Sequence, residues 1–264
     1  MTGAKILTLD IETIYINANT FGTRKVFIGP HMINRDWFIL SWAAKWLGED
    51  YTYSDALPHY KEQYAADPYD DTHIMASLWD MIDEADIVIG HNSDRFDLPK
   101  IQTRMFLNGM DPYAPVRKID TLKVAKHQFA FSSNKLDYIA HLLGLGTKLD
   151  TGGLKLWDEC LAGNKEAWRK MEEYNCYDVV LTEQVYLKMR PWITNHPNLA
   201  LYVDDTEGGE MLCPVCLSKN IRPKEYVRSN MSTFRGYKCY DCGSRRRGRK
   251  NIADRTHLLA NIGG

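Results

Sequence analysis

Two carboxylates stand in a stretch of sequence that otherwise predicts a buried β-strand, Leu7-Thr8-Leu9-Asp10-Ile11-Glu12-Thr13. Because residues i and i+2 of a strand point to the same face, we expect Asp10 and Glu12 to lie side by side. Like charges in a partly buried setting repel each other, and an unpaired buried carboxylate is costly. A divalent cation bound between the two side chains would remove that cost. A strand end that merely reaches solvent is the simpler alternative, but the apolar run before Asp10 argues against an exposed edge.

A second apolar run, Asp86-Ile-Val-Ile-Gly90, predicts another buried strand, and polar residues follow it directly. Asn92, Phe96 and Asp97 therefore fall at the carboxyl end of a strand, where open α/β sheets place their ligands. Each of them also has a structural alternative. Asn92 would suit a turn, Phe96 would suit the core, and Asp97 would serve as the N-cap of a helix that begins near Pro99.

The third candidate segment lies in a long helix predicted over residues 165–189. Tyr174 and Asp178 are four residues apart, so they share one face of that helix. The apolar run 179–181 follows directly, which indicates that the helix is buried there and that Asp178 needs a partner. An aspartate at the edge of the apolar face, paired with a lysine, is the alternative.

The elements that would position these residues belong to an α/β domain with a mixed sheet of about five strands. The first three predicted strands form an antiparallel meander and cover residues 5–10, 38–46 and 51–53. An amphipathic helix over 72–85, which Asp71 would cap, then leads into the strand 86–90, and such a crossover implies a parallel partner. Further helices are predicted over 97–108, 121–127 and 134–143.

The region from Thr13 to Arg35 contains several glycine and asparagine residues, which is typical of a loop. It also contains aromatic and apolar side chains. We therefore expect a loop that packs over the site, and not a linker.

Together, the three segments resemble the signatures of the DEDD superfamily of 3′-to-5′ exonucleases. The signatures occur in the required order as Asp10-Ile-Glu12-Thr13, Asn92-x-x-x-Phe96-Asp97 and Tyr174-x-x-x-Asp178. Glu173 stands where one branch of the superfamily has a histidine, so this chain resembles the tyrosine branch (DEDDy), which includes polymerase proofreading domains and ribonuclease D. The run from Asn92 to Pro99 is most similar to the proofreading domains of family B polymerases. The resemblance covers residues 4–190 and implies the ribonuclease H-like fold.

The resemblance also implies a mechanism, hydrolysis of phosphodiester bonds with two metal ions and release of nucleoside 5′-monophosphates. The ions would be Mg²⁺ or Mn²⁺, because four carboxylates without a histidine are hard oxygen ligands. The carboxylates that would hold the ions are Asp10, Glu12, Asp97 and Asp178. Tyr174 would orient the attacking water. The positions that match contacts to the terminal nucleotide are Thr13, Asn92 and Phe96.

The expected substrate is nucleic acid that is single-stranded or has a free 3′ end, with DNA favoured over RNA. Two alternatives remain open. One is an RNA-directed or structure-specific nuclease on the same site, and the other is a non-catalytic nucleic-acid adaptor.

Four of the six cysteines form two pairs, Cys213-x-x-Cys216 and Cys239-x-x-Cys242, separated by 22 residues. This spacing predicts one structural Zn²⁺ held by four thiolates, and the segment resembles a zinc ribbon. A module this short would not fold on its apolar core alone. We therefore predict an exonuclease domain over residues 1–203, an acidic, glycine-containing linker over 204–212, and a basic zinc-ribbon module over 213–264.

The charge is divided unequally between these parts. Residues 213–264 carry 12 Lys/Arg against 3 Asp/Glu, whereas residues 1–212 carry 21 against 31. Such a basic module, with aromatic residues among the cations, indicates a single-stranded nucleic acid partner. The residues of this predicted patch are Arg222, Lys224, Arg228, Arg235, Lys238, Arg245, Arg246, Arg247, Arg249 and Lys250. Docking to a replication or repair protein, or a solvated tail without function, would be the alternatives.

The sequence contains no run of 18 apolar residues, and it does not begin with a basic region followed by an apolar stretch. We therefore expect a cytoplasmic protein with no membrane partner. The resemblance suggests the cytoplasm of a bacterium or of a bacterium infected by a virus.

Overall fold

The computed structural model describes residues 3–22, 24, 26–147, 149, 151–203, 209, 211–229 and 231–253. The chain divides into two compact units. The first is Lys5–Leu187, and the second combines the residues before Lys5 with those after Leu187. Residues 188–203, which the sequence assigns to the first domain, thus group with the second unit. The predicted linker at 204–212 lies largely outside the described residues. The domain limits therefore remain a prediction.

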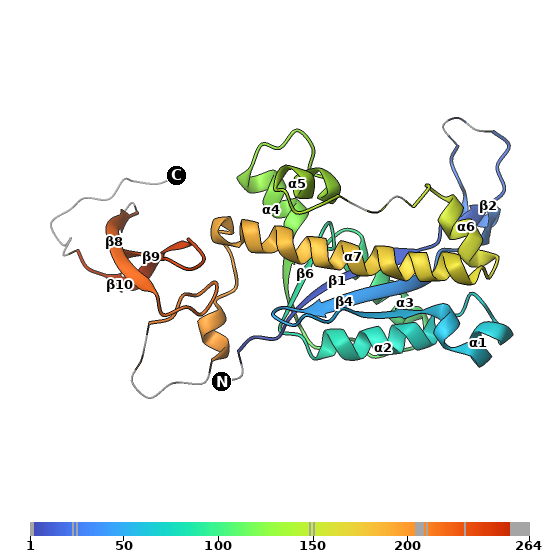
Figure 1. Ribbon diagram of the computed structural model, residues 1–264, viewed down its shortest axis with the longest axis horizontal. Helices are drawn as coiled ribbons and strands as arrows, with labels where there is room; N and C mark the ends of the chain where they lie inside the picture. The colour runs from blue at the N-terminus through green and yellow to red at the C-terminus, as the bar shows by residue number, and fades with distance from the viewer. Residues whose placement is uncertain are drawn as a thin grey trace. The chain divides into compact units, whose positions relative to one another are not determined.

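The first unit is built on a five-stranded mixed sheet with the strand order β5-β4-β1-β6-β7. The central strand β1 pairs with β4 in antiparallel and with β6 in parallel orientation, and β5 and β7 form the edges. The bounds are β1 Ile6–Thr13, β4 Ile39–Trp46, β5 Tyr53–Ala56, β6 Ile87–Gly90 and β7 Arg117–Asp120. This arrangement confirms the predicted mixed sheet and its opening meander (Figure 1).

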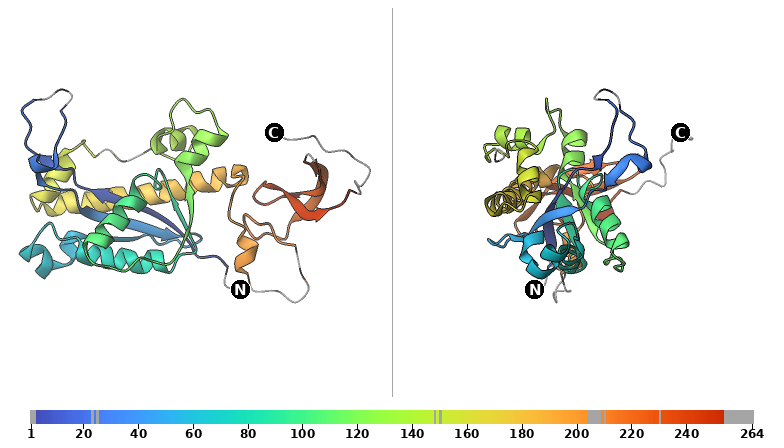
Figure 2. Two further views of the ribbon diagram at one scale, coloured as in Figure 1. Left: turned by 180° about the vertical axis from the view of Figure 1, so that it is seen from behind. Right: turned by 90° about the vertical axis from the view of Figure 1, so that its right-hand side faces the viewer.

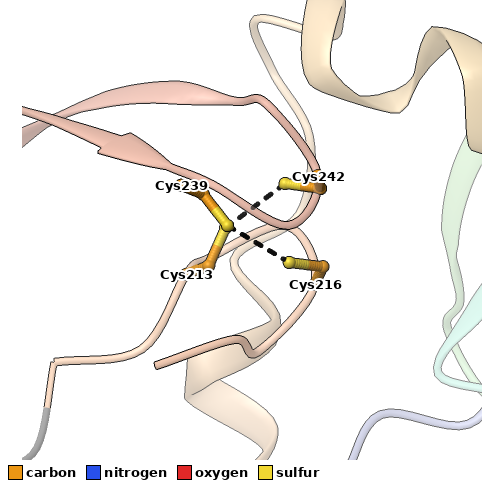
Figure 3. A group of neighbouring side chains, drawn as sticks. All are labelled: Cys213, Cys216, Cys239 and Cys242. Carbon is orange, nitrogen blue, oxygen red and sulfur yellow. Dashed lines mark hydrogen bonds between the residues drawn. The ribbon is translucent and has the colours of Figure 1, made fainter. Parts of the chain in front are cut away.

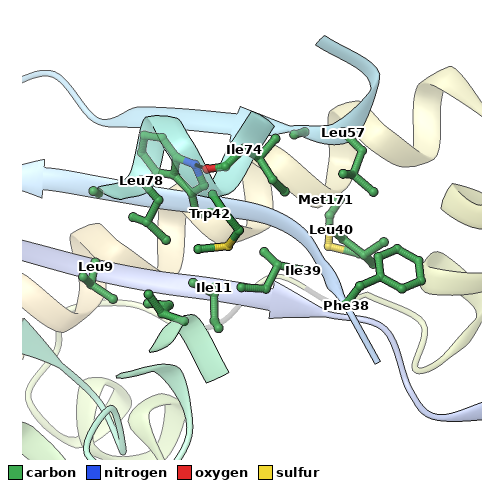
Figure 4. Close-up of a cluster of buried hydrophobic side chains, with 14 of the residues drawn as sticks. Leu9, Ile11, Phe38, Ile39, Leu40, Trp42, Leu57, Ile74, Leu78 and Met171 are labelled. Atoms are coloured by element: carbon green, nitrogen blue, oxygen red, sulfur yellow. Dashed lines mark hydrogen bonds between the residues drawn. The ribbon is translucent and has the colours of Figure 1, made fainter. Parts of the chain in front are cut away.

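The two faces of the sheet differ in chemistry. On one face, Leu9 and Ile11 of β1 lie in an apolar cluster with side chains from α2 (Thr72–Asp83) and α3 (Asp97–Leu107), as Figure 4 shows for Ile74 and Leu78. The opposite face of β1 carries Thr8, Asp10 and Glu12 and packs against α7 (Lys165–Met189). The alternation of the strand therefore places the core on one side and the acidic residues on the other.

Asp71 fixes α3 beside α2. It occupies the N-cap position of α2, as predicted, but its side chain makes no capping bond. Instead the carboxylate accepts two bonds from the Arg104 guanidinium, at 2.6 and 2.8 Å, and one from the backbone N–H of Ile39 at 3.0 Å. The side-chain amide of Asn108 donates to the same carboxylate at 2.9 Å, so these bonds tie both helices to the sheet at the amino end of β4.

The remaining helices of the first unit are short. Two of them, α1 and α6, lie in segments where the sequence predicted no helix, whereas α4 and α5 were predicted. The bounds are α1 Lys61–Ala66, α4 Thr121–Gln128, α5 Leu136–Leu142 and α6 Lys155–Leu161, with 3₁₀ turns at Pro30–Met32 and Leu57–His59.

The region predicted as a packed loop is a hairpin. Its strands are β2 (Asn17–Ala18) and β3 (Ile33–Arg35), and it projects from the sheet (Figures 1 and 2). Phe21 and Phe27 are exposed near its tip. The prediction of a packed loop was wrong, because aromatic composition alone does not tell whether a side chain finds a core to enter.

The second unit contains a three-stranded antiparallel sheet with the order β10-β9-β8. Its strands are β8 Ile221–Arg228, β9 Thr233–Cys239 and β10 Arg245–Asn251, and 3₁₀ turns lie at Arg190–Trp192 and Leu199–Tyr202. A Cβ atom at Gly236 would lie 2.2 Å from the carbonyl oxygen of Glu225, so β8 and β9 can approach this closely only with glycine there. Among the described residues, no helix has the length and apolar character needed to cross a membrane.

Candidate active site and metal centres

Three of the four predicted carboxylates converge. Asp10 and Glu12 on β1 and Asp178 on α7 each place one carboxylate oxygen within 4.8 Å of the other two. Oxygens bound to one Mg²⁺ lie about 3 to 4 Å apart, since each is about 2.1 Å from the ion. The upper limit of 4.8 Å on the separations in the cluster is close to this range, so the three oxygens can hold such an ion with little or no movement. Asp178 is 1% exposed. Three carboxylates that lie this close together, one of them buried, are better explained by a bound divalent cation than by exposure to solvent.

Asn175 supports this cluster, and the sequence analysis missed it. Its side-chain amide donates a hydrogen bond of 2.7 Å to Oδ2 of Asp10, and its Oδ1 accepts one of 3.3 Å from the hydroxyl of Ser41. Ser41 pairs with Glu12 across β1 and β4, so it lies on the same face of the sheet. The position of Asn175, three residues before Asp178 on a buried helix face, was the available signal.

A buried ion pair continues the polar seam between α7 and the sheet. Lys45 on β4 pairs with Thr8 in the ladder and binds Glu183 of α7, with 2.6 Å between Nζ and Oε1. Both side chains are about nine-tenths buried. Glu183 thus compensates the charge of Lys45.

Asp97 lies beside this cluster and not in it. It is the first residue of α3, is almost completely buried, and accepts a 3.2 Å bond from the backbone N–H of Ile11, the residue between Asp10 and Glu12. Burial raises the pKa of Asp97 to about 7, and the nearby Asp120 adds to this, although the backbone donors oppose it. A buried carboxyl this close to the cluster would ionise more readily with a cation bound.

The predicted residues Thr13 and Phe96 line a cavity of about 380 Å³ that Glu12 also borders. Lys100 closes one wall, where its Nζ donates to the hydroxyl of Thr13 at 3.2 Å and lies 4.9 Å from the centre of the Phe96 ring. The cavity thus combines an aromatic face, a cation and a carboxylate of the cluster, a set that suits a nucleotide. Trp157, another lining residue, packs edge-on against Tyr174, with 6.5 Å between ring centroids.

Asn92 opens onto a different cavity, of about 570 Å³, together with Lys126 and Lys135. Its φ of +69° is a left-handed conformation that asparagine tolerates better than most residues. Its backbone N–H donates to Asp120, which also caps α4. Asn92 and Phe96 thus line different cavities among those described, although the backbone N–H of Phe96 donates to the carbonyl oxygen of Asn92 at 3.0 Å.

The four cysteines meet in the second unit (Figure 3). The sulfurs of Cys213 and Cys242 are 3.7 Å apart, and those of Cys216 and Cys239 are 3.6 Å apart. Four thiolates at about 2.3 Å from one tetrahedral Zn²⁺ would be separated by about 3.8 Å. The donor set therefore fits zinc, and the distances exclude disulfides, whose sulfurs are bonded at about 2.05 Å.

One of these thiols is already close to ionisation. Burial alone would raise the pKa of Cys239, but hydrogen bonds from the backbone N–H groups of Cys242 and Asp241 lower it to about 7. Burial raises the pKa of Cys216. A cation is therefore needed to bring all four groups to the thiolate form.

The predicted basic patch lies on the three strands of the second unit. Because residues paired across strands share a face, Arg222, Lys238 and Arg245 form one row across all three strands. Arg235 lies on the opposite face, over the ring of Tyr226 at 5.1 Å. Arg246 differs from the others, because it is half-buried and donates to the carbonyl oxygen of Ile193 at 2.9 Å. The other members are Lys224 and Arg228 on β8 and Arg247, Arg249 and Lys250 on β10.

In a comparison with known families, residues 47–190 match the model of the RNase_H superfamily. This range exceeds half of the chain and includes Asp97, Tyr174 and Asp178. The chain belongs to the RNase H superfamily. The range begins after β1, so the inclusion of Asp10 and Glu12 in the site rests on the geometry described above.

Among solved structures, this RNase H superfamily member is similar to the family B DNA polymerase from the hyperthermophilic archaeon Pyrobaculum calidifontis. The TM-score is 0.52 with 17% sequence identity, over 72% of this chain and 25% of the polymerase chain. At this identity the likeness concerns the fold alone, and the chain spans a quarter of that polymerase. No curated protein matches this chain.

Proposed function

We propose that this chain is a 3′-to-5′ exonuclease of the tyrosine branch that releases nucleoside 5′-monophosphates, with DNA favoured as substrate. The observation that carries the proposal is the convergence of Asp10, Glu12 and Asp178 from two distant segments. The buried Asp97, bonded to the backbone between the first two, supports it. Its direction and sugar preference rest on the resemblance of the three motifs to proofreading domains.

In this proposal Asp10, Glu12, Asp97 and Asp178 hold two Mg²⁺ or Mn²⁺ ions. When bound, such ions supply a hydroxide nucleophile and stabilise the leaving 3′ oxygen. Tyr174 orients the attacking water through its hydroxyl. The 380 Å³ cavity beside Glu12 receives the terminal nucleotide, with Phe96 against the base and Thr13 at its edge. Lys100 supplies the cation of that cavity and attracts a phosphate.

The zinc ribbon has a supporting role in the proposal. One Zn²⁺ on Cys213, Cys216, Cys239 and Cys242 holds the second unit together, and the basic strands β8–β10 bind the nucleic acid substrate. The aromatic rings within reach of the cations support this role, since Arg222 lies 5.1 Å from the ring of Tyr240 and Arg247 lies 3.7 Å from that of Phe234.

The test is a comparison of two aspartate-to-asparagine variants with end-labelled DNA and RNA oligonucleotides. Asp178→Asn should reduce Mg²⁺-dependent degradation by at least about 10³-fold while oligonucleotide binding persists. Asp80→Asn, which removes the same charge from an exposed position of α2, is the control and should leave the rate unchanged. Full activity in Asp178→Asn would refute the assignment.

The same assay separates the alternatives. Faster loss of the RNA substrate would indicate an RNA-directed enzyme on the same site. If the wild-type chain binds oligonucleotides but calorimetry detects no Mg²⁺ or Mn²⁺ binding, the chain is a non-catalytic adaptor.

A further inference from the structure

The hairpin of β2 and β3 begins directly beyond the catalytic strand. Thr13 ends β1, and Asn17 begins β2. Tyr15 and Ile16, which join the two strands, line the same cavity as Glu12. Any molecule held at the base of the hairpin is therefore close to the candidate active site.

The stem of the hairpin is well ordered by polar contacts. The ladder pairs Asn17 with Arg35, and the backbone N–H of Asn19 donates to the carbonyl of Met32 at 2.9 Å. The side-chain amide of Asn34 donates to the side-chain oxygens of both Asn17 and Asn19 at 3.1 Å. These bonds connect the two strands on one face and give the hairpin a fixed direction.

The base of the hairpin is also anchored to the first unit. The guanidinium of Arg35 lies 4.7 Å from the ring centre of Tyr69 and 5.8 Å from that of Phe38. On the other strand, the hydroxyl of Tyr15 donates to the carboxylate of Asp158 in α6. The base of the hairpin is therefore held by contacts on both sides, next to β2 and at β3.

Large apolar side chains near the tip have no place in the core. Phe21 is fully exposed, with a relative exposure of 106%, and Phe27 is 85% exposed. Val26 and Ile28 beside Phe27 are exposed as well. Isolated exposed apolar residues need no explanation, but a group of them on one projecting element marks a binding surface.

The charge of the hairpin indicates what this surface binds. The segment between Glu12 and Asp36 contains Arg24, Lys25 and Arg35 and no Asp or Glu. The charge balance of this segment is opposite to that of residues 1–212 as a whole, which carry 31 acidic and 21 basic residues. Cations together with exposed aromatic rings fit a single-stranded nucleic acid, whose phosphates are neutralised while its bases stack.

We propose that the hairpin tip binds the substrate strand outside the cleavage site, with Phe21 and Phe27 stacking on its bases. This inference rests on the proposed nuclease function, and it adds a second contact to the terminal-nucleotide cavity. A long single strand reaches both the cavity and the tip, whereas a mononucleotide ester reaches only the cavity. The hairpin should therefore affect substrates of different length differently.

The test uses the full chain and the double variant Phe21→Ala/Phe27→Ala. KM for a single-stranded 30-nucleotide DNA should rise about 10- to 100-fold, by analogy with the loss of one or two stacked bases. Hydrolysis of the p-nitrophenyl ester of thymidine 5′-monophosphate should be unchanged. The matched control is Phe106→Ala/Leu107→Ala, which removes an exposed apolar pair from α3 and should change neither substrate.

Binding separates this inference from the nuclease assignment. In the Asp178→Asn background, fluorescence anisotropy with the labelled 30-nucleotide DNA should show the same 10- to 100-fold weakening for the hairpin variant, even if the wild-type chain hydrolyses nothing. Equal affinity of the hairpin variant and its parent would overturn the proposal. Equal weakening by the α3 control would overturn it too, since the effect would then belong to exposed apolar surface in general.

Discussion

The two candidate metal sites of this chain are built in opposite ways. The carboxylates Asp10, Glu12 and Asp178 come from a sheet and a helix of a unit that has a large apolar core of its own. In the second unit, the thiols of Cys213 and Cys239 are themselves part of a small buried cluster with Val215. We therefore propose that the first site uses metal for chemistry and that the second uses metal for folding.

The largest effect should come from removing zinc. A chelator, or Cys239→Ser, should unfold the second unit, because structural zinc supplies about 10 kcal/mol or more to such modules. The sheet of the first unit should stay folded. Limited proteolysis and one-dimensional NMR would show this, and Cys176→Ser, a cysteine of α7 outside the cluster, is the control. A second unit that stays protected without metal would contradict the comparison.

The opposite response is expected of the acidic site. Without metal, Asp178→Asn should stabilise the first unit by about 1 kcal/mol, because it removes one of three repelling carboxylates. Adding Mg²⁺ should then raise the Tm of the wild-type chain and not that of the variant. Thermal unfolding followed by circular dichroism measures both. Destabilisation of the metal-free variant would mean that Asp178 holds the fold and not an ion.

Asn175 provides a further test of the difference between the two sites. If the acidic site is formed by the fold before metal binds, a side chain must orient its carboxylates, and Asn175 is in place to do so. Asn175→Ala should lower kcat by about 10- to 100-fold with a small effect on KM, since Asp10 loses its 2.7 Å donor. Ser41→Ala should act in the same direction but more weakly, because Ser41 reaches Asp10 only through Asn175. Steady-state kinetics at saturating Mg²⁺ would measure these effects. A loss in Ser41→Ala that exceeds the loss in Asn175→Ala would contradict this order.

The smallest expected effect is a difference in nucleic acid binding between the two faces of the sheet β8–β10. The double variant Arg222→Ala/Lys238→Ala removes two charges from the face that carries the row of basic residues across all three strands. It should reduce the slope of log affinity against log salt concentration by about 2. Arg228→Ala/Arg235→Ala removes the same charge from the other face and should change the slope less. Binding titrations at several salt concentrations measure the slope. Equal slopes for both variants would indicate that the ribbon contributes net charge without a defined binding face.

The sequence predicted the parts of the fold and of the candidate site that depend on a single local pattern. The strand with Asp10 and Glu12, the long helix with Asp178, and the cysteine pairs were all located correctly, because periodicity and ligand spacing are local properties. Asp97 and Asn92 show the limit of such patterns. Their motif is local, but only the packing of α3 decides that Asp97 lies beside the cluster and that Asn92 opens onto another cavity.

Long-range contacts account for the rest. The bond from Asn175 to Asp10 joins residues 165 positions apart, and the helical spacing of Asn175 and Asp178 places Asn175 near the site without naming Asp10 as its partner. The prediction of a packed loop at the hairpin was wrong for a related reason. Aromatic residues such as Phe21 indicate burial on average, and the sequence does not reveal that the stem carries this one away from the core.

The most direct test of the proposed 3′-to-5′ exonuclease activity follows the two ends of a DNA strand separately. With Mg²⁺, a 5′-labelled single-stranded DNA should shorten one nucleotide at a time, and the released product should be nucleoside 5′-monophosphates. The same DNA with a phosphorothioate at its 3′-terminal linkage should be strongly protected. Internal cleavage, loss of the 5′ label as a mononucleotide, or no shortening at all would contradict a 3′-to-5′ exonuclease at Asp10, Glu12, Asp97 and Asp178.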